Sequence, residues 1–287
     1  EVSDGFDIFI SQSWCMPGWL KYIGLVMHFY WGTALAIGCG VLAVMCALDL
    51  LGLLPTVPVD LPDSREIGQI IWSPCLMPSA CLATLVMLFA LPACCGRSKQ
   101  VFLDAACINQ TNPQLKAAGV NSIAGFLAKS ESMLVLCGTV YFTRLWCMYE
   151  LAVFSAIHDG GHIIFCPVFV KAMVLAGFCI VMLMSVGNVR TLLPDGIMFI
   201  FGACLMIPFF CLLMHALRRS MREQKKLLRL IDDFRILSAE CRMQTDYDFI
   251  IGSIKQLYGS TENFEQYVSY KLKEKLLRGI RGRFRLR

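Results

Sequence analysis

Four long apolar runs constrain this 287-residue chain more than any other feature. They occupy residues 23–54, 67–95, 169–189 and 197–217. A helix of about 20 apolar residues crosses the hydrocarbon core of a bilayer, so each run is long enough to span one. Only 16% of the residues are charged, whereas 57% are hydrophobic, which is unusual for a soluble domain. The sequence therefore predicts an integral membrane protein with four spans; a helical protein with a very apolar core is the alternative.

Basic residues beside the runs predict the orientation in the membrane. The loops after the first and third runs contain one arginine each, Arg65 and Arg190. Arg97 and Lys99 follow the second run, and six basic residues follow the fourth within a few helical turns. Because positive charge accumulates on the cytosolic side, we expect both termini and residues 96–170 there, or on the equivalent stromal or matrix side. The rule names a side and no organelle.

The C-terminal region, residues 218–287, accounts for the net charge of +5. It contains 17 of the 26 Lys and Arg residues but only nine of the 21 acidic residues. Next to a membrane, such a region attracts anionic lipid headgroups. A nucleic-acid partner is not expected, because Phe284 is the only aromatic residue in the basic run KLKEKLLRGIRGRFRLR.

The same region has a helical pattern. Apolar residues recur near a helical period over residues 217–243, which predicts one continuous amphipathic helix. Residues 246–277 predict two shorter helices on either side of YGSTEN, with Ser260 or Thr261 as the N-cap of the second. We expect these helices to form a folded cap over the soluble part rather than an arm that binds a partner.

Short segments of another kind lie between the apolar runs. FDIFIS, QVFLD, SMLVLCGT and HIIFCPV are short, apolar and rich in β-branched or aromatic residues, as buried strands are. Helical stretches at 112–132 and 141–161 follow the second and third of them. Alternating strands and helices predict a small α/β domain with a doubly wound parallel sheet of about four strands. Two membrane hairpins would interrupt it, because a hairpin enters and leaves on one side.

Four segments, in order, resemble the boxes of a TIR (Toll/interleukin-1 receptor-like) domain: GFDIFISQSW, VFLDAACI, MLVLCG and YFTRLWCMYEL. The multi-spanning TIR-like proteins of dinoflagellates and related algae are the most similar type. The resemblance covers roughly residues 4–16 and 99–168, and it implies a flavodoxin-like domain formed by residues 1–22 and 96–168. Gln12 and Ser13 depart from it, because NAD-cleaving members often have a basic or aromatic residue there. The loop AACINQTNP also lacks the arginine-aspartate and proline-glycine of receptor-type adaptors, and no fifth strand is evident.

The resemblance also implies a function. Some TIR domains cleave NAD between nicotinamide and ribose, and others only self-associate into signalling assemblies. The catalytic glutamate of the cleaving members corresponds to Glu150. A carboxylate there would stabilise the oxocarbenium-like ribose that forms as nicotinamide leaves. NAD would be a substrate, with no permanently bound cofactor.

In a sheet of order 2-1-3-4, ligands bind beyond the carboxyl ends of the first and third strands. The residues at these ends are the candidate NAD-binding residues: Ser11, Gln12, Ser13, Trp14, Cys137 and Gly138, with Thr139 beside them. Trp14 is placed to stack on a nicotinamide or adenine ring.

Other roles are open for the same residues. Glu150 is alternatively a solvated helix charge paired with Arg144 or Lys171. Trp14 and Trp19 border the first apolar run, where tryptophans often anchor a chain at the membrane interface. Asp104, at the end of a strand, is interpreted as a cap of the following loop.

The 15 cysteines show no CxxC pair and no zinc-type spacing, so we expect neither a metal site nor disulfides. Cys94 and Cys95, at the end of the second run, are candidates for acylation, with packing as the alternative.

Two functional readings remain open. The first is a membrane-anchored TIR-like signalling protein that hydrolyses NAD through Glu150 or acts by self-association as a homo-oligomer. The second is a non-catalytic structural or accessory subunit of a larger membrane complex, such as a photosynthetic or respiratory one. Small residues in the first run, Gly32, Gly38 and Gly40, favour helix partners in the bilayer. A transporter is less expected, because few ionisable residues lie within the runs.

Overall fold

The structure, a computed structural model, describes residues 5–55, 57–59, 70–73, 75–94, 99–109, 111–138, 140–158, 162–186, 228–241 and 243–274, with Leu277 and isolated residues between 210 and 226. It forms two compact units. The sheet unit comprises Glu1–Gly24, Arg97–Phe169 and Ser220–Arg287. The hairpin unit comprises Leu25–Gly96 and Val170–Arg219.

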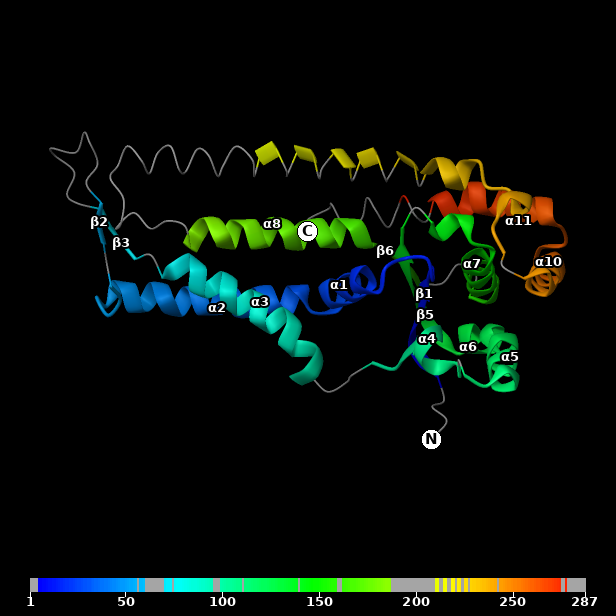
Figure 1. Ribbon diagram of the computed structural model, residues 1–287, viewed down its shortest axis with the longest axis horizontal. Helices are drawn as coiled ribbons and strands as arrows, with labels where there is room; N and C mark the ends of the chain where they lie inside the picture. Colours follow the sequence, from blue (N-terminus) through cyan, green and yellow to red (C-terminus); the bar gives the residue numbers. More distant parts are fainter. Residues whose placement is uncertain are drawn as a thin grey trace. The chain divides into compact units, whose positions relative to one another are not determined.

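A parallel sheet of four strands forms the centre of the sheet unit (Figure 1). The strands are β1 (Phe6–Gln12), β4 (Val101–Leu103), β5 (Ser130–Cys137) and β6 (His162–Pro167), in the order β4-β1-β5-β6. These are the four predicted strands, and a small parallel sheet is confirmed. Since β1 and β5 are neighbours, Ser11 lies opposite Val135 and Gln12 opposite Leu136.

The two faces of the sheet are buried by different elements. Phe9, Met133 and Val135 belong to the core that includes the helix α7 (Leu145–Ile157). Alternate residues such as Ile10 and Leu136 point to the other face and are also buried. There the thiol of Cys166 lies 3.9 Å from the carbonyl oxygen of Gly24, in the helix α1 (Gly18–Phe29). Burial on both faces explains why the strand sequences are apolar without alternation.

The helical stretch predicted at 112–132 is divided in two. α5 (Pro113–Asn121) begins at Asn112, whose side chain accepts hydrogen bonds from the backbone N–H groups of Gln114 and Leu115. α6 (Ile123–Ala128) follows after Ser122, whose hydroxyl donates to the carbonyl of Ala118. A serine hydroxyl that bonds to the preceding turn competes with the helix, which explains the break.

The stretch predicted at 141–161 begins with a 3₁₀ turn, η1 (Tyr141–Thr143), before α7. A short helix, α4 (Asp104–Cys107), follows β4. Buried residues surround all sides of α7, and ten of its 13 residues are buried. α7 is therefore a central helix of the sheet unit.

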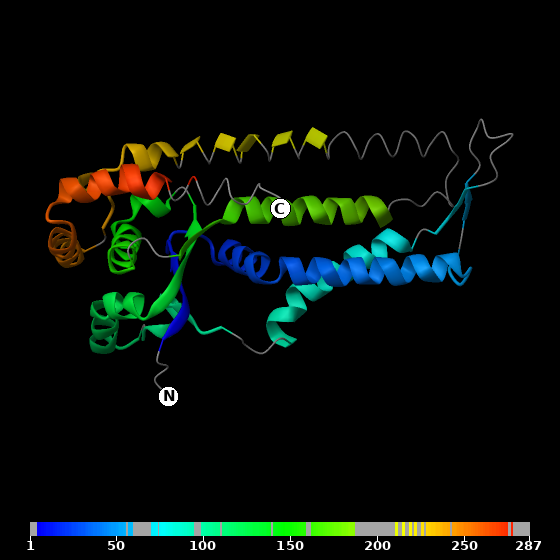
Figure 2. The same ribbon diagram turned by 180° about the vertical axis from the view of Figure 1, so that it is seen from behind.

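The C-terminal helices cover α7. They are α10 (Gln244–Tyr258), α11 (Thr261–Tyr267) and the π-helical turn η3 (Val268–Leu272). Figures 1 and 2 both show α10 on the side of α7 that faces away from the strands. The hydroxyl of Tyr258 donates to the carbonyl of Ala152 at 2.9 Å, which ties α10 to α7.

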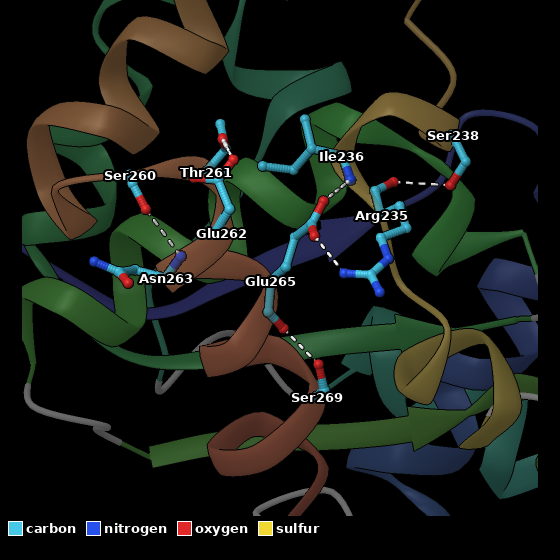
Figure 3. Close-up of polar contacts among 9 residues, drawn as sticks. All are labelled: Arg235, Ile236, Ser238, Ser260, Thr261, Glu262, Asn263, Glu265 and Ser269. Carbon is cyan, nitrogen blue, oxygen red and sulfur yellow. Dashed lines mark hydrogen bonds and ion pairs between the residues drawn. The ribbon is translucent and has the colours of Figure 1, made fainter.

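The prediction of one continuous helix over residues 217–243 is wrong for the second half of this range. Helical residues end at Asp232, and the chain then forms a 3₁₀ turn, η2 (Ile236–Ser238). Glu265 of α11 accepts hydrogen bonds from the backbone N–H of Ile236 and from the guanidinium of Arg235, both at 2.8 Å (Figure 3). The N–H of Ile236 thus bonds to a side chain of another helix instead of to a carbonyl of its own helix. The spacing of apolar residues does not reveal such a tertiary contact.

The two shorter helices around YGSTEN are present, and Ser260 is the cap. Its hydroxyl oxygen accepts from the N–H of Asn263 at 3.1 Å (Figure 3). The hydroxyl of Thr261 contacts the carboxylate of Glu262 instead. Ser260 has the extended backbone of an N-cap, and Thr261 is already the first helical residue.

In the hairpin unit, α2 (Trp31–Leu50) packs against α3 (Leu76–Cys94) through small residues. Ala34 and Gly38 of α2 are buried, as are Ala80 and Thr84 of α3. A Cβ atom on Gly38 would clash with Thr84 Oγ1, at a separation of only 1.9 Å. Such close approach through small residues is typical of helices that pair in a bilayer. Two short strands, β2 (Val57–Val59) and β3 (Ile70–Trp72), lie between α2 and α3 in the sequence. They pair with each other in antiparallel fashion.

Two helices of the described residues, rather than the four expected, are long and apolar enough to cross a membrane. They are α2 and α3, which fall within the first and second predicted spans. The third span coincides with α8 (Val168–Val186), but its side chains are described only to Met182, which is too short for the same criterion. The fourth, residues 197–217, lies almost entirely outside the described residues. Of the candidate acylation sites, Cys94 is exposed at the end of α3, and Cys95 is outside the described residues.

Candidate functional site

The site is built where the carboxyl ends of β1 and β5 meet the first turns of α7. Ser11 follows Phe9 by two residues, so its side chain points to the same face of the sheet, towards α7. There its hydroxyl lies 2.5 Å from Oε2 of Glu150. Strand alternation and the packing of α7 on β1 therefore bring together two predicted site residues that are 139 positions apart.

Tyr141 completes a buried hydrogen-bonded cluster with these two residues. Its hydroxyl lies 2.6 Å from Oγ of Ser11 and 3.3 Å from the carbonyl oxygen of Cys147. Both Tyr141 and Ser11 are inaccessible to solvent. Tyr141 was not predicted as a site residue. The signal available in the sequence was a tyrosine in the segment between the third strand and the helix of Glu150.

Burial controls the protonation of Glu150. It raises the pKa of the carboxyl from 4.5 to about 8, and the negative charge of Asp104 acts in the same direction, whereas the hydrogen bond from Ser11 opposes it. The folded protein therefore holds Glu150 mostly as the neutral acid at pH 7. Carboxyl groups with a strongly raised pKa cluster at functional sites, and Glu150 lies at the carboxyl ends of β1 and β5, where ligands bind in such sheets.

The interpretation of Glu150 as a solvated helix charge is wrong. Glu150 is only 7% exposed. Arg144, one of the partners considered for it, forms an ion pair with Glu240 at 3.1 Å. The apolar residues around Glu150 in LWCMYELAVF belong to a helix that is buried on all sides, and this could not be decided from the sequence.

Asp104 joins Gln12 and Trp14 at the rim of the site. Its carboxylate accepts from Nε2 of Gln12 at 3.0 Å and from Nε1 of Trp14 at 2.6 Å. Trp14 is nevertheless 62% exposed, so much of the indole is accessible to a ligand or to a membrane interface. Asp104 was interpreted as a loop cap. Its position at the carboxyl end of β4, the strand beside β1, was the signal that it belongs to this rim.

The remaining candidate residues have structural contacts. Ser13 is buried, and its hydroxyl accepts from the N–H of Cys15 at 3.3 Å. Cys137 is a member of the hydrophobic core. Gly138 lies close to Met16, since an added Cβ would come within 2.8 Å of the methionine methyl. Thr139 lies outside the described residues. Ser11, Gln12 and Trp14 are thus the predicted binding residues with side chains directed to the cluster or its rim.

A cation also lies at the rim. Nη2 of Arg144, the residue preceding α7, contacts the thiol of Cys15 at 2.6 Å. Cys15 follows β1, so the guanidinium is next to the loop that carries Ser13 and Trp14. Arg144 therefore places a positive charge beside this loop.

No family model, curated protein or solved structure matches this chain. Within the part of the chain that the structure describes, no group of three His, Cys, Asp or Glu residues is arranged to hold a metal ion. The sheet topology and the cluster around Glu150 are therefore the features that indicate a function.

Proposed function

We propose that this protein is a membrane-anchored TIR-like enzyme that hydrolyses the N-glycosidic bond of NAD with Glu150. The observation that carries the proposal is the contact between Ser11 and Glu150 at the carboxyl edge of β1 and β5. In doubly wound sheets this edge, at the point where strand order reverses, is where ligands bind. The resemblance of LWCMYEL to the catalytic helix of NAD-cleaving TIR domains independently supports Glu150.

The chemistry assigns Glu150 an electrostatic role. The bond between C1′ of the ribose and the nicotinamide nitrogen breaks, and its electron pair leaves with nicotinamide, which becomes neutral. The ionised carboxylate stabilises the positive charge that develops on the ribose. Water then adds to C1′, and its proton passes to Glu150. The products are nicotinamide and ADP-ribose.

The rim supplies groups for the rest of the substrate. Trp14 offers an exposed indole for stacking on an aromatic ring. Arg144 offers a guanidinium that suits a pyrophosphate. Both contacts remain predictions.

Membrane anchoring is part of the proposal. α2 and α3 have the length and composition of spans, and most of their residues are not buried. Residues 169–189 and 197–217 would add two more spans, with the sheet unit and both termini on the cytosolic or equivalent side. The basic residues after 217 would then lie near anionic headgroups. Resistance to alkaline extraction, together with protease accessibility of tags at both termini in sealed vesicles, tests this arrangement. A chain released by alkali would overturn it.

Turnover of NAD tests the catalytic proposal. We would incubate detergent-solubilised full-length protein with NAD and identify nicotinamide and ADP-ribose by mass spectrometry. Wild type should release both products and Glu150→Gln should not, because the amide keeps the size of the side chain but carries no negative charge. Glu131→Gln is the control, since Glu131 is exposed on β5. Equal turnover by Glu150→Gln would remove Glu150 from the mechanism.

A second candidate is a non-catalytic module that acts by self-association or as a subunit of a larger membrane complex. The observation that favours it is the low exposure of Glu150, whose carboxyl already has a partner in Ser11. Absence of product from concentrated protein, together with a stable higher-order assembly, would favour this candidate.

A further inference from the structure

The three hydrogen bonds of the cluster can form together only when the Glu150 carboxyl is protonated. The contacts join Glu150 to Ser11, Ser11 to Tyr141, and Tyr141 to the carbonyl oxygen of Cys147. Each hydroxyl has one proton to donate, and the carbonyl has none. Two hydroxyl protons cannot fill three contacts, so the third contact requires a proton on Glu150.

The two protonation states of Glu150 distribute these protons differently. When Glu150 is ionised, Ser11 donates to the carboxylate, and the single proton of Tyr141 goes either to Ser11 or to the carbonyl of Cys147, so one contact stays unfilled. When Glu150 is protonated, it donates to Ser11, Ser11 donates to Tyr141, and Tyr141 donates to that carbonyl, so all three contacts are filled. The Ser11 hydroxyl therefore reverses its direction between the two states.

We propose that Tyr141 is a positioning residue that, through Ser11, fixes the orientation of the Glu150 carboxyl and tunes its protonation equilibrium. Its importance for catalysis rests on the proposed function, because Glu150 is the catalytic group only if the enzyme cleaves NAD. The effect of Tyr141 on the protonation of Glu150 does not depend on that activity.

The surrounding groups leave Glu150 as the member of the cluster that titrates. Burial raises the pKa of the Tyr141 hydroxyl and of the Cys147 thiol well above their ordinary values, so both stay neutral. Desolvation likewise raises the pKa of Tyr149 on the same helix. Asp104 faces Glu150 from the end of β4 and favours its neutral form. Further out, Cys137 of β5 faces Tyr141, and Arg144 faces Cys147.

Tyr141→Phe should favour the ionised form of Glu150. In the protonated state, loss of the tyrosine hydroxyl leaves two protons, on Ser11 and Glu150, for the one contact between them, so one buried donor has no acceptor in the cluster. In the ionised state, Ser11 still donates to the carboxylate, so its proton has a partner. An unsatisfied buried donor costs enough to lower the midpoint of the titration by about one pH unit.

Infrared spectroscopy of the full-length protein in lipid nanodiscs measures this midpoint. The carbonyl stretch of a protonated, buried carboxylic acid is followed as the pH is raised, and the band lost in Glu150→Gln is assigned to Glu150. The midpoint should fall in Tyr141→Phe. It should not move in Tyr258→Phe, which removes another tyrosine hydroxyl that donates to a backbone carbonyl of α7. An unchanged midpoint in folded Tyr141→Phe would overturn the proposal.

Ser11→Ala tests whether Tyr141 acts on Glu150 through Ser11. The single variant also provides a test of the cluster if Tyr141→Phe does not fold. Since the Ser11 hydroxyl stabilises the carboxylate, its removal should raise the midpoint, and Tyr141→Phe added to Ser11→Ala should then have no further effect. A further shift in the double variant, or no shift in Ser11→Ala, would contradict a role through Ser11.

Turnover distinguishes this inference from the proposed function. If wild type releases no nicotinamide but the infrared midpoint shifts as expected, the enzyme proposal fails and the positioning role stands. If wild type is active, its pH–rate profile should shift in Tyr141→Phe by the same amount as the infrared midpoint. A purely structural role of Tyr141 would lower activity without moving the profile.

Discussion

The indole Nε1 of Trp146 donates a hydrogen bond to Oδ2 of Asp246 at 3.1 Å. This bond joins α7, the helix that carries Glu150, to the first turn of α10. Trp146 also packs edge-to-face on Tyr149 and near Phe249, with ring centroids 5.6 Å and 6.4 Å apart. The C-terminal region is therefore part of the support of the candidate site, although it lies outside the segments on which the resemblance rests.

Loss of this bond should destabilise the sheet unit. Trp146→Phe and Asp246→Ala should each lower the free energy of unfolding by about 1 kcal/mol, and the double variant should lose less than the sum. Thermal unfolding followed by circular dichroism measures the cycle. Asp248→Ala is the control, because the exposed carboxylate of Asp248 accepts from Gln244 within α10 rather than from α7. Strict additivity would show that the bond contributes nothing.

Stability should fall as the pH rises, because the pKa of Glu150 is about 8 in the folded chain and 4.5 without burial. Between these values the folded state holds a proton that the unfolded chain has lost. The free energy of unfolding therefore contains a contribution from this proton that is fully present below pH 4.5. It declines between pH 4.5 and about 8, by up to about 1.4 kcal/mol per pH unit, and is lost above about 8. Unfolding midpoints across this window should decline in wild type and in Glu131→Gln. In Glu150→Gln the decline should be shallower; an identical slope would show that Glu150 does not titrate there.

The activity of the proposed enzyme should increase with pH up to about 8. Its ionised carboxylate is the reactive form, and burial keeps Glu150 protonated below that value. The rate of nicotinamide release, measured at saturating NAD over this range, checks the expectation. A rate that falls as the pH rises from neutrality would indicate that the neutral acid is the working form.

Glu265 should be essential to the turn before α10. Glu265→Ala removes the acceptor of the Ile236 N–H and should destabilise the protein by about 1–3 kcal/mol. Arg235→Ala breaks only the ion pair of a 73% exposed side chain, so its effect should be below about 1 kcal/mol. Unfolding midpoints of the two variants, compared side by side, test this order. A larger loss in Arg235→Ala would reverse the assignment.

A side chain at Gly38 should destabilise the contact between α2 and α3. Gly38→Ala places a methyl group against Thr84 and should lower the stability of the hairpin by about 1–3 kcal/mol. Gly40→Ala is the matched control, because no atom lies within 4 Å of its added Cβ. Thermal stability in detergent distinguishes the two. Equal stability of the two variants would show that the helices do not approach at Gly38.

The strands were predictable because they are buried on both faces and therefore read as continuous apolar runs. The resemblance and the carboxyl edge of such sheets made Ser11 and Glu150 candidate residues, but their direct contact was not predicted. Tyr141 and Asp104 were missed as site residues because their roles depend on tertiary contacts across β1. The same cause explains the end of the helix before Arg235: the carboxylate of Glu265, 29 residues from Ile236, determines it.

The position of the α2–α3 hairpin has a consequence for how the chain folds. β1 pairs with β4 and β5, yet both partners are synthesised only after the whole hairpin. The first strand must therefore wait, unpaired and apolar, while the hairpin forms, because contacts between distant segments are slow to close. The sheet, and with it the carboxyl edge at Ser11, is completed only after the hairpin has been synthesised. Until then the unpaired strand is a segment prone to aggregation.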